Sequence, residues 1–203
     1  MTSREAIFSS IRANKPNLDR PLPDVPLYDQ PTAAAPVDAF IANLKAMGGS
    51  YLIPEGNDPA QPILDRLSTA KVVCSVVPEI RGNRTIDAST PQIAVEDVDI
   101  AIVRAAFGVV ETGSICLTEN ELVINSLGYL AQHLIVLFDV NDLVPNIHHA
   151  YRRNEWRTAN YAVFHTGPSA TADIEGVLVH GAQGVRSLTV IQCPRHSPTG
   201  GGT

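Results

Sequence analysis

The chain has 203 residues, of which 44% are hydrophobic and 18% charged, so it is long enough for one soluble domain with a substantial core. Its net charge of -6 argues against nucleic acid as the main partner, because phosphate binding relies on clustered Lys and Arg. No stretch approaches the roughly 20 apolar residues of a membrane helix, and no secretory signal opens the chain. We therefore expect no membrane span and a cytoplasmic location.

The first 35 residues predict a helix followed by an extended connection. A helix is expected over residues 2–13, because Thr2 and Glu5 can form a capping box at its start. Residues 14–35 are rich in proline and show little periodicity, which is typical of a connection that runs over a surface. We expect the 1–35 segment to dock on the main domain or on another subunit, such as a second copy of the chain in a homo-oligomer.

Alternating strand and helix patterns predict an α/β domain over residues 36–193, followed by a flexible tail over residues 194–203. Expected helices cover residues 36–47, about 59–67, 141–153 and 171–178. Expected strands cover residues 50–53, 71–77, 99–105, 133–138, 161–165 and 188–192. A hairpin of residues 107–110 and 114–117 would interrupt the regular alternation. We therefore predict a mixed, largely parallel sheet flanked by helices.

Cysteine and histidine spacing predicts no metal or iron-sulfur cluster on this chain. Cys74, Cys116 and Cys193 are far apart, and each lies within an apolar run. No Cys-x-x-Cys pair occurs, so the usual patterns of zinc sites and iron-sulfur clusters are absent. His148 and His149 are adjacent, and on a helix their side chains would point in different directions. Buried, unreactive thiols are the expected state of the cysteines.

One candidate site is the turn after the strand predicted at 161–165. Gly167 would let the backbone approach a ligand closely, and Ser169 and Thr171 offer hydroxyl groups at the start of the helix predicted there. Free N–H groups of a first helical turn favour an anion or a carboxylate. The same residues are equally consistent with simple helix capping, with Asp173 complementing the helix dipole.

The second candidate site is the turn Glu111-Thr112-Gly113-Ser114. A Glu at a strand end beside glycine can act as a nucleophile, a general base or a hydrogen-bond acceptor. The pattern also fits an ordinary hairpin in which Gly113 supplies a positive φ. Arg104 interrupts an apolar strand just before this turn, so it could pair with Glu111 or bind a substrate carboxylate.

At these two turns the chain resembles the lactate-utilisation (LUD) family, in particular its LutC/YkgG group. The likeness is carried by Ala-Phe-Gly-Val-Val-Glu-Thr-Gly-Ser at 106–114 and by Gly-Pro-Ser-Ala-Thr-Ala-Asp-Ile-Glu at 167–175, with weaker support from 179–184. The resemblance implies a fold like that of the NagB/RpiA/CoA-transferase superfamily. It also implies a role in oxidising L-lactate to pyruvate together with iron-sulfur partner proteins, which would carry the clusters that this chain cannot hold.

Three hypotheses follow from the residues and the resemblance. In the first, the chain is a lactate-utilisation subunit that binds a small carboxylate or an anionic cofactor between the two turns. Glu111 and Ser114 would then contact the reacting end. The remaining expected ligand contacts are Arg104, Thr112, Gly113, Gly167, Pro168, Ser169, Thr171 and Asp173. In the second, it is a free-standing acyl- or CoA-transferase-like or isomerase-like enzyme that uses Glu111. In the third, it is a non-catalytic assembly or regulatory protein whose contacts lie in residues 1–35.

Overall fold

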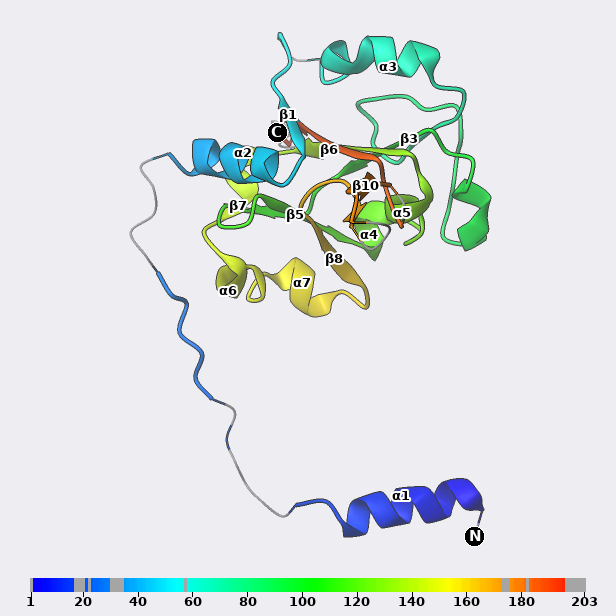
Figure 1. Cartoon of the computed structure of the whole chain (residues 1–203), viewed down its shortest axis with the longest axis vertical. Helices are drawn as coiled ribbons and strands as arrows, with labels where there is room; N and C mark the ends of the chain where they lie inside the picture. Colours follow the sequence, from blue (N-terminus) through cyan, green and yellow to red (C-terminus); the bar gives the residue numbers. More distant parts are fainter. Residues whose placement is uncertain are drawn as a thin grey trace, which may run out of the picture.

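The computed structural model describes residues 2–16, 21, 23–29, 35–56, 58–172, 176–181 and 183–195 (Figure 1). Helix α1 (Ser3–Ala13) begins with the capping box predicted from Thr2 and Glu5, and none of its residues is buried. Part of the connection that follows lies against the main body. Asn146 donates a 2.8 Å hydrogen bond from its side chain to the carbonyl of Leu27. This contact joins the residues around Leu27 to the start of α6 (Ile147–Ala150).

The centre of the body is a five-stranded parallel sheet. Its strands are β1 (Ser50–Leu52), β2 (Val73–Ser75), β3 (Ile100–Arg104), β6 (His133–Phe138) and β11 (Ser187–Gln192), in the spatial order β1-β11-β6-β3-β2. The central strand, β6, is the near-continuous apolar run HLIVLF, and all of its residues after His133 are buried. Runs of this kind are typical of strands that are covered on both faces.

A second, four-stranded sheet carries the predicted hairpin. Strands β4 (Phe107–Val109) and β5 (Ser114–Thr118) pair antiparallel, and β7 (Leu143–Val144) and β8 (Ala162–His165) complete the order β7-β4-β5-β8. The predicted fold class, an α/β protein with a largely parallel sheet flanked by helices, is confirmed. The antiparallel pairs form a sheet of their own and do not extend the parallel one.

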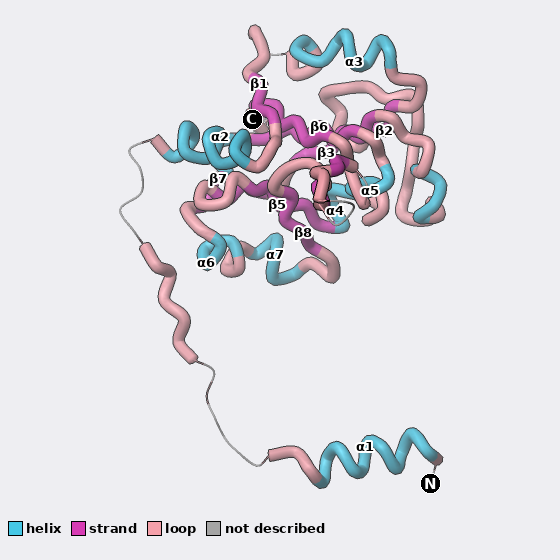
Figure 2. The backbone as a smooth tube through the Cα atoms, in the orientation of Figure 1, coloured by secondary structure: helices cyan, strands magenta, loops and turns pink. Residues whose placement is uncertain are grey.

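Helices cover the parallel sheet on both faces. Helix α2 (Pro36–Ala46) buries Phe40 and Leu44 completely in the cluster that contains Val103 of β3. On the other face, Ile63, just before α3 (Leu64–Thr69), packs with Ile102 of the same strand. Figure 2 shows the strands running through the body with the helices around them. The remaining short helices are α4 (Glu119–Leu122), α5 (Leu127–Leu130), α6 (Ile147–Ala150) and α7 (Asn154–Thr158). Across the described ranges, no helix is long and apolar enough to cross a membrane.

The helix predicted over residues 141–153 is wrong. A 3-10 turn at Val140–Asp142 is followed by β7, and the short helix α6 begins only after Asn146. Pro145 explains the break, because proline has no N–H group and its ring clashes with the preceding helical turn. Asn146 then starts a new helix by accepting hydrogen bonds from the backbone N–H groups of His148 and His149, at 3.0 and 3.1 Å.

The helix predicted over residues 171–178 is also wrong where the structure describes the chain. Strand β9 (Ala170–Thr171) pairs antiparallel with β10 (Val179–His180), so Thr171 extends a strand and does not open a helix. Asp173 lies outside the described residues. The argument that a helix N-terminus receives an anion at this turn therefore has no structural basis.

Candidate functional site

The two turns singled out in the sequence lie side by side. Strands β5 and β8 pair antiparallel, which places Ile115 opposite His165. The hydroxyl oxygens of Thr112 and Ser114 lie 2.7 Å apart, and those of Ser114 and Thr166 lie 2.8 Å apart. Ser114 is only 3% exposed. A partly buried chain of three hydroxyl groups, with Ser114 at its centre, therefore joins the Glu-Thr-Gly-Ser turn to the Thr-Gly-Pro-Ser turn.

Both turns also lie very close to helix α2, and in each turn the close approach occurs at a glycine. Gly113 has a φ of +65°, and a Cβ atom placed on it would come within 2.2 Å of the backbone nitrogen of Leu44. A Cβ atom on Gly167 would come within 2.2 Å of the carbonyl oxygen of Met47. The absence of a side chain at these two positions thus permits close approach of α2, which is a different role from the predicted approach of a ligand.

The Gly-Pro-Ser turn borders a cavity of about 380 Å³, which we call the motif cavity. Its walls come from residues 164–170, from residues 183–185, from Tyr129 and from Met47 at the end of α2. Ser169 fixes the two walls to each other, because its N–H group donates a 2.8 Å hydrogen bond to the carbonyl of Val185. Of the predicted contacts, Gly167, Pro168 and Ser169 line this cavity, and Ser114 reaches its edge through Thr166.

His165 is the residue that sequence reasoning missed. It lines the motif cavity with only 9% of its surface exposed, and its buried Nε2 atom has no hydrogen-bond partner among the described residues. Burial lowers the pKa of His165 to about 4, so the imidazole is neutral at pH 7. Its ring centroid lies 5.5 Å from that of Tyr129. A signal was present in the sequence, since His165 directly precedes the Thr-Gly-Pro-Ser turn.

The depressed pKa of His165 predicts that acid destabilises the fold. Above pH 6.5 the residue is neutral in both the folded and the unfolded state and adds no pH dependence. As the pH falls from 6.5 towards 4, only the unfolded state binds the proton, so the free energy of unfolding decreases, by about 3 kcal/mol once the pH reaches 4. Urea unfolding of the native protein and of His165→Gln, each at pH 7 and pH 4.5, isolates this contribution. An equal loss on acidification in both proteins would contradict it.

Glu111 lies away from the motif cavity. Its side chain is exposed, and its carboxylate accepts a 3.1 Å hydrogen bond from the backbone N–H of Ile147, at the start of α6. This contact supports the short helix that follows Pro145. Among the predicted residues, Thr171 lies in β9, next to the cavity wall at Ala170.

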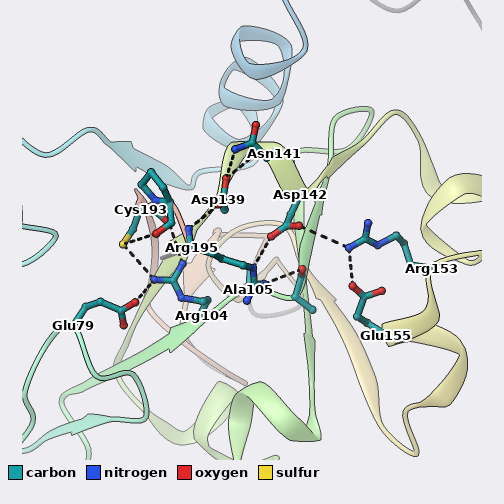
Figure 3. A network of polar contacts seen from close by, with 12 residues as sticks. Glu79, Arg104, Ala105, Asp139, Asn141, Asp142, Arg153, Glu155, Cys193 and Arg195 are labelled. Carbon is teal, nitrogen blue, oxygen red and sulfur yellow. Dashed lines mark hydrogen bonds and ion pairs between the residues drawn. The ribbon is translucent and has the colours of Figure 1, made fainter. Parts of the chain in front are cut away.

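Arg104 does not pair with Glu111. It is the last residue of β3, at the carboxyl edge of the parallel sheet, whereas Glu111 follows β4 in the second sheet. The Arg104 guanidinium instead lies 2.5 Å from a carboxylate oxygen of Glu79 and donates a 2.9 Å hydrogen bond to the carbonyl of Cys193 (Figure 3). The expected Arg104–Glu111 pair is therefore corrected to a largely buried Arg104–Glu79 pair.

A second arginine extends this polar network along the same edge. The Arg195 side chain donates to Asp142 at 2.7 Å and to the carbonyl of Ala105 at 2.8 Å, and the backbone N–H of Arg195 donates to Asp139 at 2.7 Å (Figure 3). Each cation of the network is thus matched by a carboxylate. The network holds residues 193–195 onto the ends of β3 and β6.

The cysteines are in the expected state. All three are free and buried. Burial raises the pKa of Cys116 to about 12, which leaves its thiol protonated at neutral pH. In the part of the chain that the structure describes, no group of three His, Cys, Asp or Glu residues is arranged to hold a metal ion.

Comparison with known proteins gives one family and one solved structure. The family model described as "LUD domain" matches residues 87–192, which is 106 of the 203 residues and includes both turns and most of the motif cavity. A crystal structure of a DUF162 family protein from Deinococcus radiodurans matches with a TM-score of 0.59 and 15% sequence identity. The match covers 78% of this chain and 96% of that one, and at this identity it shows the fold alone. No curated protein matches the chain.

Proposed function

The chain belongs to the LUD-domain family, and from that membership we propose that it is a subunit of an L-lactate utilisation system that binds a small carboxylate in the motif cavity. The observation that carries the proposal is the Nε2 atom of His165, which is buried beside this cavity without a partner. Buried polar atoms in folded proteins normally have partners, so an orphaned one at a cavity wall points to a ligand group.

The chemistry of the cavity suits a 2-hydroxy acid. A neutral imidazole nitrogen can accept a hydrogen bond from the hydroxyl group of lactate or, in its other tautomer, donate one to the carbonyl oxygen of pyruvate. The hydroxyl groups of Thr166 and Ser169 can donate to a carboxylate. Oxidation of lactate to pyruvate releases two electrons and two protons. In this proposal the electrons pass to iron-sulfur partner proteins, as the family resemblance implies.

The N-terminal helix supports the partner side of the proposal. Ile7, Phe8 and Ile11 share one face of α1, and they are 60%, 46% and 59% exposed. An apolar face of this kind is typical of a helix that is buried by another surface. We propose that it contributes to contacts with the other proteins of the system.

The proposal is tested by titrating the full-length protein with sodium L-lactate and sodium pyruvate in a calorimeter. We expect His165→Gln and Ser169→Ala each to weaken binding of the better ligand about tenfold or more, which is the effect of losing one buried hydrogen bond, while Glu96→Gln on the exposed surface leaves it unchanged. Circular dichroism at pH 7 confirms that each variant is folded. In a strain that lacks the gene, His165→Gln and Ser169→Ala should fail to restore growth on L-lactate, whereas Glu96→Gln should restore it.

A Glu111→Gln variant distinguishes this proposal from the transferase alternative. Because the Glu111 carboxylate is engaged with the N–H of Ile147 outside the cavity, Glu111→Gln should retain ligand binding. Binding that survives His165→Gln but is lost in Glu111→Gln would move the site to the hairpin turn and favour an enzyme that uses Glu111.

A further inference from the structure

A second cavity lies at the opposite end of the parallel sheet from the Arg104–Glu79 pair. It has a volume of about 600 Å³ and is formed where β3, β6 and β11 begin, at Ile100, His133 and Ser187. The end of α3 closes one side of it. We call it the basic cavity. It shares no lining residue with the motif cavity, so a ligand in one would not occupy the other.

Positive charge gathers around the basic cavity. Arg66, Lys71 and Arg186 line it, against the single carboxylate of Asp99, which leaves a formal local charge of 3 − 1 = +2. This local excess contrasts with the net charge of -6 of the whole chain. Within the described residues, none of the three cations forms a salt bridge, unlike the arginines at the carboxyl edge of the sheet. Their charge is thus available to a ligand.

Asp99, the carboxylate among the described residues that line the basic cavity, is already engaged with the backbone. One oxygen of Asp99 accepts hydrogen bonds from the N–H groups of Lys71 and Val72, at 2.7 and 2.9 Å. These two hydrogen bonds lower the pKa of Asp99, so it stays ionised while it holds the segment before β2 in place. The acid therefore serves to shape the cavity wall.

The walls of the basic cavity are fixed by neighbouring strands. The Arg66 guanidinium donates a 2.9 Å hydrogen bond to the hydroxyl of Thr189 in β11. The N–H of Arg186 donates to the carbonyl of Gln132 at 2.8 Å, immediately before β6. The guanidinium of Arg66 is thus attached to β11, and the backbone of Arg186 is held next to the start of β6, which favours binding of a ligand without large rearrangement.

The pKa of His133 reflects the excess positive charge around the basic cavity. The Nδ1 atom of His133 lies 2.8 Å from the hydroxyl oxygen of Ser187 at the cavity wall. The pKa of His133 is lowered first by burial and then by the positive charges of Arg66 and Arg186, with Asp99 acting in the opposite direction. Two guanidinium groups therefore act on the same imidazole, which is the electrostatic environment that an anion would relieve.

We propose that the basic cavity binds the phosphate groups of a small phosphorylated molecule, such as a nucleoside diphosphate. Guanidinium groups match phosphate oxygens in charge and in their paired geometry. A diphosphate carries enough negative charge to neutralise the local +2, which a monocarboxylate does not. The volume lies within the range of about 300–1,000 Å³ that small-molecule sites occupy, and the side chains of Ala70 and Gln132 offer apolar and amide surface for the rest of such a molecule.

The experiment is calorimetric titration of the full-length protein with sodium pyrophosphate and with ADP, at low and at physiological salt. We expect both probes to bind, with an affinity that falls as salt rises because the charges are screened. Arg66→Gln combined with Arg186→Gln should weaken binding at least tenfold, whereas Arg157→Gln on the exposed surface of α7 should not change it. By NMR, the pKa of His133 should rise when pyrophosphate is added.

The relative affinities of the two probes show which part of the ligand is recognised. If ADP binds more tightly than pyrophosphate, the site also contacts the nucleoside. If the two affinities are equal, the site recognises the phosphate groups alone. Either result supports the proposal if the paired Arg variant loses the binding. Binding of neither probe at millimolar concentration would overturn it, and so would binding that is unchanged in the folded Arg66→Gln/Arg186→Gln protein. Retained L-lactate or pyruvate binding in that variant would show that the two cavities act separately.

Discussion

Replacing Arg104 by methionine should lower the free energy of unfolding by about 3–5 kcal/mol at pH 7, because it leaves the carboxylate of Glu79 buried without its cation. The side chains of Arg104 and Glu79 are only 14% and 15% exposed, so solvent cannot replace the lost partner. The substitution also removes the 2.9 Å hydrogen bond to the carbonyl of Cys193. Urea unfolding followed by circular dichroism measures the change.

The double variant Arg104→Met/Glu79→Gln is the matched control. With both charges removed, the free energy of unfolding should recover most of what the single variant loses, since a buried ion pair contributes little compared with neutral groups of similar size. A double variant as unstable as Arg104→Met would show that the loss comes from packing or from the contact with Cys193.

Gly113→Ala should destabilise the fold by about 2–5 kcal/mol, the sum of a left-handed backbone penalty and of overpacking. Its φ of +65° is unfavourable for any residue with a Cβ atom, and that atom would lie 2.2 Å from the backbone nitrogen of Leu44. Helix α2 would have to move away from the hairpin turn, which would expose the fully buried side chain of Leu44. Thermal and urea unfolding measure the loss.

Substitution of Gly56 separates the left-handed backbone penalty from the overpacking, which act together at Gly113. The φ of Gly56, +81°, carries the same backbone penalty, but a Cβ atom there would meet nothing within 4 Å. Gly56→Ala should therefore lose only about 1–2 kcal/mol. If Gly56→Ala and Gly113→Ala lose equal free energy of unfolding, the close contact between Gly113 and α2 contributes nothing measurable to stability.

Local patterns predicted the elements that depend on local chemistry. The capping box of Thr2 and Glu5, the apolar run of β6 and the hairpin turn at Gly113 are all present in the structure. The two wrong helices have physical causes of other kinds. Pro145 interrupts the helix predicted over residues 141–153. This local signal was present in the sequence, but the prediction followed the apolar periodicity. The second fails because Thr171 pairs with a strand eight residues further on, and such pairing is not visible in helical periodicity.

The sequence could predict the candidate site only where its residues are neighbours along the chain. The adjacency of the two turns follows from strand pairing, and it was expected because both carry the family resemblance. Periodicity gives no distance between Arg104 and Glu111, although only six residues lie between them, because the chain passes from one sheet to the other. The importance of His165 arises from its burial beside Tyr129, and burial appears only in the folded structure.

The order of the parallel sheet also constrains how the protein can fold during synthesis. Strand β1 pairs with β11, and β11 lies between β1 and β6. The ribosome therefore releases β1 more than a hundred residues before the strand that joins it to the sheet exists. Until β11 emerges, β3 and β6 can pair, but β6 has an open edge on its other side. A nascent chain would keep that edge exposed from the end of β6 at Phe138 until β11 begins at Ser187, which makes this stage the most vulnerable to aggregation and the one where a chaperone would help most.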